Sequence, residues 1–122
     1  MKIRINGNSV RFRLTRSDVK QLAVTNRLEE KVDFGGQPLL YSIKISDGRD
    51  LSSSFENCTI TLYMPAKMIG ELVDTDKVGF ENISGGLHLL VEKDFTCIDN
   101  VSEDQSDNYP NPLAKSVYEE GD

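Results

Sequence analysis

The stretch VRFRLT at residues 10–15 has a similar counterpart fifty residues later, ITLYMP at residues 60–65. Apolar residues take every second position in both stretches, which is the period of a strand with one buried face. Shifting the chain by 50 places residues 10–43 over residues 60–93 without a gap. The identical pairs are Leu22/Leu72, Thr25/Thr75, Gly35/Gly85, Gly36/Gly86, Leu39/Leu89 and Leu40/Leu90. About two identities are expected by chance from ordinary residue usage, so the sequence predicts an internal duplication.

Each repeat has the pattern of a strand, a short helix, and two strands joined by a glycine turn. Thr15 followed by Asp18 is typical of a helix start. The predicted helices span about 16–24 and 66–74, and the predicted hairpin strands span about 27–34, 38–46, 77–83 and 87–93. Neither unit is large enough for a core of its own. We therefore expect an α+β fold in which a duplicated β-α-β-β unit forms one mainly antiparallel β-barrel or sandwich with two short helices.

The charge divides the 122 residues into three parts. Residues 1–46 hold nine Lys/Arg and four Asp/Glu, residues 47–98 hold four and nine, and residues 99–122 hold one and seven. This favours a single globular domain over 1–98, made of repeats at about 1–46 and 51–98. Residues 99–122 are predicted to be an acidic, mostly disordered tail.

The composition argues against most enzyme and membrane classes. The chain has one histidine, two cysteines and no recognisable catalytic or metal-binding motif, so we expect no catalytic residue, no metal site and no cofactor. It shows neither a signal-peptide pattern nor an apolar run long enough for a membrane helix. The expectation is a non-enzymatic, cytoplasmic protein without a membrane partner.

Basic side chains alternate with aliphatic ones along the first two predicted strands. The cations that should share one face are Lys2, Arg4, Arg11 and Arg13. A basic stripe of this kind is the electrostatic footprint of nucleic-acid binding. The alternative is a solvated strand face, paired across the sheet with Glu29, Glu30, Glu81 or Glu92.

Two short motifs resemble the AbrB/MazE-type swapped-hairpin domain. They are Gly7-Asn8-Ser9 followed by Arg13-Leu14-Thr15, and Ile60-Thr61-Leu62-Tyr63-Met64-Pro65-Ala66-Lys67 with the segment that follows it. The resemblance implies exchanged hairpins, here within one chain as a monomeric pseudo-dimer. It also implies DNA contacts from Arg4, Asn8, Ser9 and Arg13. The second repeat lacks this set, because its equivalents are Ser54, Cys58, Thr59 and Tyr63, and Thr15 stands where that family has proline.

The whole chain also looks like a member of a small bacterial family of unknown function. The features that carry this likeness are the Glu-Lys-Asp-Phe segment at 92–95 and the Pro-Asn-Pro step at 110–112. This likeness implies no activity.

Three functional interpretations follow from these observations. The first is a nucleic-acid-binding regulator or antitoxin-like module. The second is a protein-interaction module whose acidic tail binds a basic protein through Tyr109, Leu113, Val117 and Tyr118; its counterpart is a tail that only solubilises or folds back over the basic half. The third is a phosphohydrolase similar to the triphosphate-tunnel enzymes. That class needs an N-terminal Glu-x-Glu-x-Lys, where this chain has Lys2-Ile3-Arg4-Ile5-Asn6.

Overall fold

The computed structural model describes residues 1–95 and 106–110. The elements, in chain order, are β1 (Lys2–Asn6), β2 (Ser9–Leu14), α1 (Arg16–Thr25), β3 (Arg27–Asp33), β4 (Pro38–Ser46), β5 (Ser52–Glu56), β6 (Thr59–Pro65), α2 (Ala66–Asp74), β7 (Gly79–Ser84) and β8 (Leu87–Lys93). The order hairpin, helix, hairpin occurs twice, and the mainly β architecture with two short helices agrees with the α+β prediction. Within the described residues, neither helix is long and apolar enough to cross a membrane.

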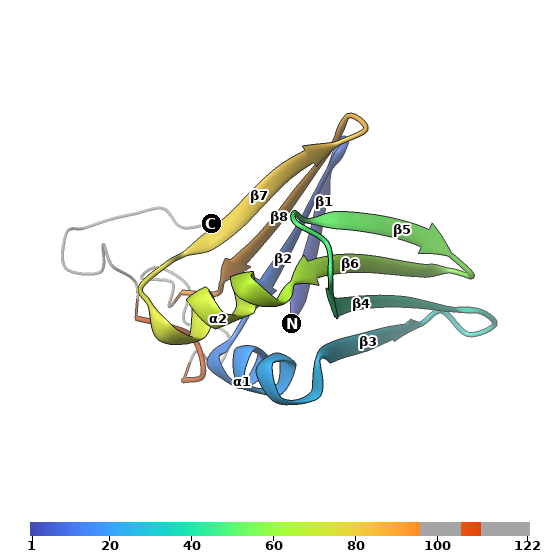
Figure 1. The fold of residues 1–122 in the computed structure, drawn as a ribbon. Helices are drawn as coiled ribbons and strands as arrows, with labels where there is room; N and C mark the ends of the chain where they lie inside the picture. The colour runs from blue at the N-terminus through green and yellow to red at the C-terminus, as the bar shows by residue number, and fades with distance from the viewer. Residues whose placement is uncertain (96–105, 111–122) are drawn as a thin grey trace.

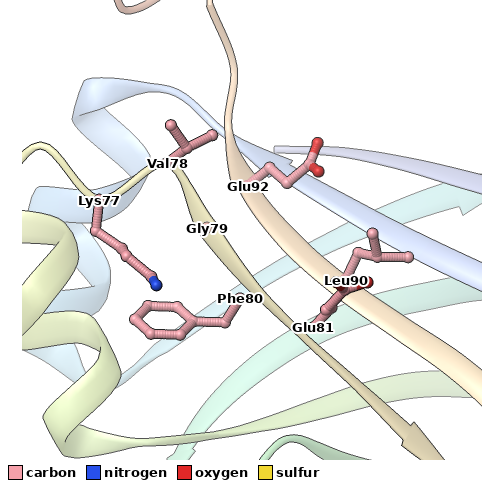
Figure 2. A pocket seen from close by; sticks show the side chains of 7 residues that line it. All are labelled: Lys77, Val78, Gly79, Phe80, Glu81, Leu90 and Glu92. Atoms are coloured by element: carbon pink, nitrogen blue, oxygen red, sulfur yellow. The ribbon is translucent and has the colours of Figure 1, made fainter.

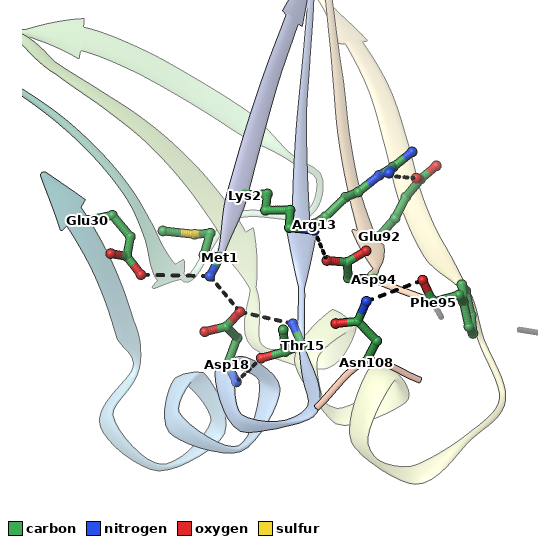
Figure 3. A network of polar contacts seen from close by, with 10 residues as sticks. All are labelled: Met1, Lys2, Arg13, Thr15, Asp18, Glu30, Glu92, Asp94, Phe95 and Asn108. Carbon is green, nitrogen blue, oxygen red and sulfur yellow. Dashed lines mark hydrogen bonds and ion pairs between the residues drawn. The ribbon is translucent and has the colours of Figure 1, made fainter. Parts of the chain in front are cut away.

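The start of α1 is held by the signature that the sequence shows. The Thr15 hydroxyl accepts a hydrogen bond from the Asp18 amide at 3.2 Å, and the Asp18 carboxylate accepts one from the Thr15 amide at 2.9 Å. This capping box satisfies two amides at the helix start. Asp18 also lies 2.8 Å from the amino nitrogen of Met1, so the same carboxylate joins α1 to the beginning of β1 (Figure 3).

The strands form two four-stranded mixed sheets. Sheet A has the order β1-β2-β8-β7, and sheet B has the order β3-β4-β6-β5. Each sheet takes one hairpin from each half of the chain, joined in the middle by the parallel pairs β2–β8 and β4–β6. The other four pairings are antiparallel. Figure 1 shows the sheets diverging from the two helices, with their hairpin tips pointing in different directions.

The β-barrel that the sequence offered as one architecture is not formed. Among the described strands, β1 and β7 remain the edges of sheet A, and β3 and β5 remain the edges of sheet B. A barrel requires these edges to pair with each other. The splayed hairpins in Figure 1 keep the edges of the two sheets apart.

The hairpin registers repeat at the offset of fifty residues. Ile3 pairs with Phe12 in the first half, and Ser53 pairs with Leu62 in the second. The β3–β4 and β7–β8 hairpins obey the same offset. The central parallel pairs differ by two residues: Val10 faces Leu89, whereas Ile60 faces Tyr41 instead of its offset partner Leu39. A shift of two residues keeps every side chain on its own face of the sheet.

Both halves bury their apolar faces in one core. Its residues come from both sheets and both helices: Phe12, Leu14, Val19, Leu22, Leu28, Ile43, Leu51, Leu62, Met64, Met68, Ile69, Leu72, Leu89 and Val91. Helix α1 contributes Val19 and Leu22 to it, and α2 contributes Met68, Ile69 and Leu72. This shared core lies between the sheets where they approach the helices.

Residues 106–110 lie against this fold, although they belong to the segment predicted as a tail. The amide of Arg16 donates to the Asp107 carbonyl at 3.1 Å, and the amide of Tyr109 donates to the Asp94 carbonyl at 2.9 Å. Asn108 is buried. Asp107 and Asn108, which the sequence places in a mostly disordered tail, therefore have defined contacts with the fold. The other residues of 99–122 lie outside the described residues, as does the predicted domain boundary at 98.

Candidate functional site

The β1–β2 hairpin carries all six residues that the sequence assigned to nucleic-acid binding. In its antiparallel register, Lys2 faces Arg13 and Arg4 faces Arg11. The neighbouring pair Ile3 and Phe12 points the other way, toward the core. Lys2, Arg4, Arg11 and Arg13, here called the cation cluster, therefore stand as two cross-strand pairs on the outer face of sheet A.

Asn8 and Ser9 lie at the turn end of the same hairpin, where they have structural partners. The Asn8 side-chain amide donates to the Gly86 carbonyl at 2.6 Å, and the Asn8 carbonyl accepts from the His88 amide at 3.0 Å. Ser9 faces His88 across the β2–β8 pairing. The Asn8 amide thus joins the tip of one hairpin to the tip of the other.

Two carboxylates from the β8 side lie beside the cation cluster. One Glu92 oxygen lies 3.7 Å from Nε of Arg11 and 4.0 Å from Nε of Arg13. The buried Asp94 carboxylate lies 3.2 Å from the Lys2 ammonium (Figure 3). The Glu92 pairs are long and partly exposed, and surface pairs of this kind contribute little stability, typically about 0–1 kcal/mol.

The cross-sheet pairing that the sequence offered as the alternative is found for Glu92. The other three candidates have different neighbours: Glu29 pairs with Arg27, Glu81 with His88, and Glu30 lies 3.7 Å from the Met1 amino group. Arg4 is exposed, and no carboxylate within residues 1–95 and 106–110 pairs with it. Among the described residues, the cation cluster therefore has two carboxylates beside it, Glu92 and Asp94.

The cation cluster surrounds a shallow hollow of about 280 Å³, which is also lined by Ile3. Four cationic side chains around a small open space can hold an anionic group such as a phosphate by charge-assisted hydrogen bonds. Within the described residues, no group of three His, Cys, Asp or Glu side chains is placed to hold a metal ion.

A second hollow of about 520 Å³ lies on the β7–β8 side of the same outer face (Figure 2). It lies beside Gly79, between Glu81, Leu90 and Glu92. A Cβ atom at Gly79 would overlap the Val91 carbonyl, so the close approach of these strands requires glycine. The outer face thus has cations on the β1–β2 hairpin and carboxylates on the β7–β8 hairpin. An anionic ligand is attracted by the first and repelled by the second, so it should bind on the β1–β2 side.

The comparisons with known proteins give one match. A family model described as "Family of unknown function (DUF7009)" matches residues 1–113. The chain belongs to this family. No curated protein and no solved structure matches the chain. Membership of DUF7009 agrees with the prediction of a family of unknown function, and the comparisons give no support to the AbrB/MazE resemblance.

The DUF7009 match includes Tyr109, which the sequence assigned to a protein partner. In the structure its ring packs edge-on against Phe95, with centroids 5.9 Å apart. The Lys93 ammonium lies 4.9 Å and the Arg16 guanidinium 5.7 Å from its centroid. Burial raises the pKa of Tyr109, while the positive charge of Arg16 acts in the opposite direction. Tyr109 is thus bound to its own chain; Leu113, Val117 and Tyr118 lie outside the described residues.

Sequence reasoning did not single out Lys93 or Gly79, although both carry a signal. Fifty residues earlier, the repeat has Ile43 in place of Lys93 and Glu29 in place of Gly79. A comparison of the two repeats for their differences, rather than their identities, would have found both positions.

Proposed function

We propose that this member of DUF7009 is a non-enzymatic nucleic-acid-binding protein whose interface is the outer face of β1 and β2. The observation that carries the proposal is the pairing of Lys2 with Arg13 and of Arg4 with Arg11 directly across the hairpin. Like charges facing each other across strands destabilise a sheet. Glu92 and Asp94 offset part of this repulsion. A phosphate backbone bound to the cations offsets more of it and releases the counterions of the nucleic acid, which is the main source of affinity.

The shape of the hairpin supports the same proposal. β1 is an edge strand of sheet A, and the hairpin tip points away from the helices (Figure 1). β2 is paired with β8 along its length, so the cations lie on two neighbouring strands at one edge of a four-stranded sheet, and some proteins bind DNA through the strands of a sheet. The Asn8 bond to Gly86 holds the tip in position, so less conformational entropy is lost on binding.

We further propose that the chain is a duplicated, single-chain relative of the AbrB/MazE-type domain, acting in the bacterial cytoplasm. The hairpin registers at offset 50 and the hairpins exchanged between the halves support this origin. The positions that match the cation cluster in the second half are Ser52, Ser54, Thr61 and Tyr63. None of these is basic, so the proposed contact is made by one hairpin and the bound nucleic acid needs no twofold symmetry.

The test is fluorescence anisotropy of the full chain with a labelled DNA duplex between about 50 and 200 mM salt. Four phosphate contacts give a slope of log affinity against log salt of about −3.6, which is about a 150-fold loss of affinity over this range. With Arg4→Ala and Arg11→Ala combined, two contacts remain, the slope falls to about −1.8, and the loss is about 12-fold.

The matched control removes the cross-strand pair Arg27 and Lys44, which has the same charge but lies on sheet B. This double alanine variant should keep the slope and the affinity of the unmodified chain. Equal effects of the two double variants would show that only overall charge matters. That result, or absence of binding at about 50 mM salt, would reject the interface.

A further inference from the structure

A third hollow, of about 310 Å³, lies between the two helices at the end of β8. It is on the opposite side of sheet A from the cation cluster. Its walls combine cations, apolar side chains and one aromatic ring: Arg16, Val19, Lys20, Leu72, Val73, Thr75, Asp76, Lys93 and Tyr109. Three cations face one carboxylate, so the lining has a surplus of two positive charges.

Lys93 is the unusual member of this lining. The residue is only 7% exposed, and its ammonium donates to the Thr75 carbonyl at 3.0 Å and lies 4.9 Å from the centroid of the Tyr109 ring. No carboxylate of residues 1–95 or 106–110 pairs with it. Lysine is rarely buried to this extent without a negatively charged partner, because the ammonium loses its hydration. The site therefore holds a buried positive charge that a bound anion would neutralise.

The first half of the chain shows that packing alone does not require a lysine at position 93. Ile43 holds the matching position of the β3–β4 hairpin, where it faces Leu28 and is fully buried in the core. Lys93 has the same relation to Val78, whose carbonyl accepts its amide hydrogen bond. An aliphatic residue serves this position in one hairpin, and a lysine replaces it in the hairpin that borders the hollow.

The docked residues 106–110 supply the aromatic wall. Tyr109 is held by its amide bond to the Asp94 carbonyl and by its edge-on contact with Phe95. Its ring lies close to the charged groups of both Lys93 and Arg16. This arrangement places an apolar surface directly beside two cations.

We propose that this hollow binds a small phosphomonoester with an apolar or aromatic body. The phosphate lies at the Lys93 ammonium with Arg16 and Lys20 around it, and the body packs on the exposed Val73 and on Tyr109. The two surplus positive charges match the dianionic phosphate, and about 310 Å³ is at the lower end of the sizes of small-molecule sites. This site is separate from the proposed nucleic-acid interface, because Lys93 points to the core side of sheet A.

The experiment is an NMR titration of the full, isotope-labelled chain with phenyl phosphate, followed through backbone amides. We expect saturable shifts at Val19, Thr75, Lys93 and Tyr109. Replacement of Lys93 by methionine keeps the length of the side chain, and should weaken phenyl phosphate binding at least about tenfold through the loss of a charge-assisted hydrogen bond. The matched control is Lys77→Met, which removes a lysine that lies 5.1 Å from the Phe80 ring outside this hollow, and it should bind as the unmodified chain does (Figure 2).

A second variant keeps the proposal testable if Lys93→Met fails to fold. Tyr109→Ala should weaken phenyl phosphate more than inorganic phosphate, because it removes the wall for the body but leaves the cations. Three outcomes would overturn the proposal: no saturable shift up to about 10 mM, shifts confined to the cation cluster, or equal affinity in the unmodified chain and every folded variant at Lys93 or Tyr109.

Discussion

Replacing Gly79 with alanine tests the closest approach between two strands of sheet A. An added Cβ would overlap the carbonyl oxygen of Val91 and lie 2.9 Å from the Cα of Glu92. Both are backbone atoms, so β7 must move away from β8 to make room. Inserting a methyl group into such a contact destabilises a protein by about 1–3 kcal/mol, and the stiffer unfolded chain offsets about 0.4–1 kcal/mol of this.

Gly70→Ala is the matched control, because it makes the same chemical change in the same chain. Gly70 lies inside α2, and a Cβ there meets no atom within 4 Å. Alanine is favoured over glycine inside a helix by about 1 kcal/mol, so this variant should be stabilised. The free energies of unfolding of the two variants should therefore differ by about 1–4 kcal/mol.

Urea unfolding followed by circular dichroism measures this difference through the transition midpoints at equal slope. In a thermal scan it corresponds to a gap of roughly 4–16 °C between the two variants. If Gly79→Ala is as stable as Gly70→Ala, the close approach at Gly79 does not exist. The β7–β8 register, and with it the hollow in Figure 2, would then be wrong.

Two further predictions concern charged side chains. Glu92→Gln removes the carboxylate beside Arg11 and Arg13, so DNA affinity at low salt should rise; unchanged binding in the anisotropy assay would show that Glu92 does not compete with phosphate. Hydrogen bonds from Thr15 and Ser17 hold the pKa of Asp107 below its usual value of about 3.9. The ionised carboxylate therefore favours docking of this residue above about pH 3.9, and docking weakens as the pH falls through the lowered pKa. The Arg16 amide, which donates to the Asp107 carbonyl, should therefore shift in NMR spectra as the pH falls below the usual aspartate value of about 3.9. Asp107→Asn should remove this transition, and the same titration in the variant would contradict the assignment.

Much of the local structure could be predicted because it depends on residues close together in the chain. The alternation in residues 10–15 shows which side chains of β2 face the core, and the Thr15–Asp18 capping box marks the start of α1. The glycine pair at 35–36 marks the turn between β3 and β4. These features also place the cation cluster on one face, since that inference needs only the period of a strand.

The partners of the strands could not be predicted in the same way. Alternation determines the face of a strand and carries no information about which strand lies beside it. The parallel β2–β8 pairing is what brings Glu92 between Arg11 and Arg13, so the partial neutralisation of the cation cluster depends on contacts across 79 residues of sequence. The docking of Asp107 and Asn108 was not predicted for a related reason. It rests on backbone hydrogen bonds and on the amide of Asn108, which bonds the Phe95 carbonyl, and a polar composition does not reveal such contacts.

The two hollows used in the proposals lie where the halves of the chain differ. The cation cluster of β1–β2 corresponds to the uncharged Ser52, Ser54, Thr61 and Tyr63 of β5–β6, while the buried Ile43 of β4 corresponds to Lys93 of β8. Packing explains the positions that the halves share, such as the buried pair Leu22 and Leu72. Packing does not explain two like-charged pairs across one hairpin, which Glu92 and Asp94 neutralise only in part, or a buried ammonium without a carboxylate partner in the described chain. Both lower the stability of the unliganded fold. A bound anion offsets both effects, so DNA and phenyl phosphate, which both carry phosphate groups, are the ligands that test the two proposals.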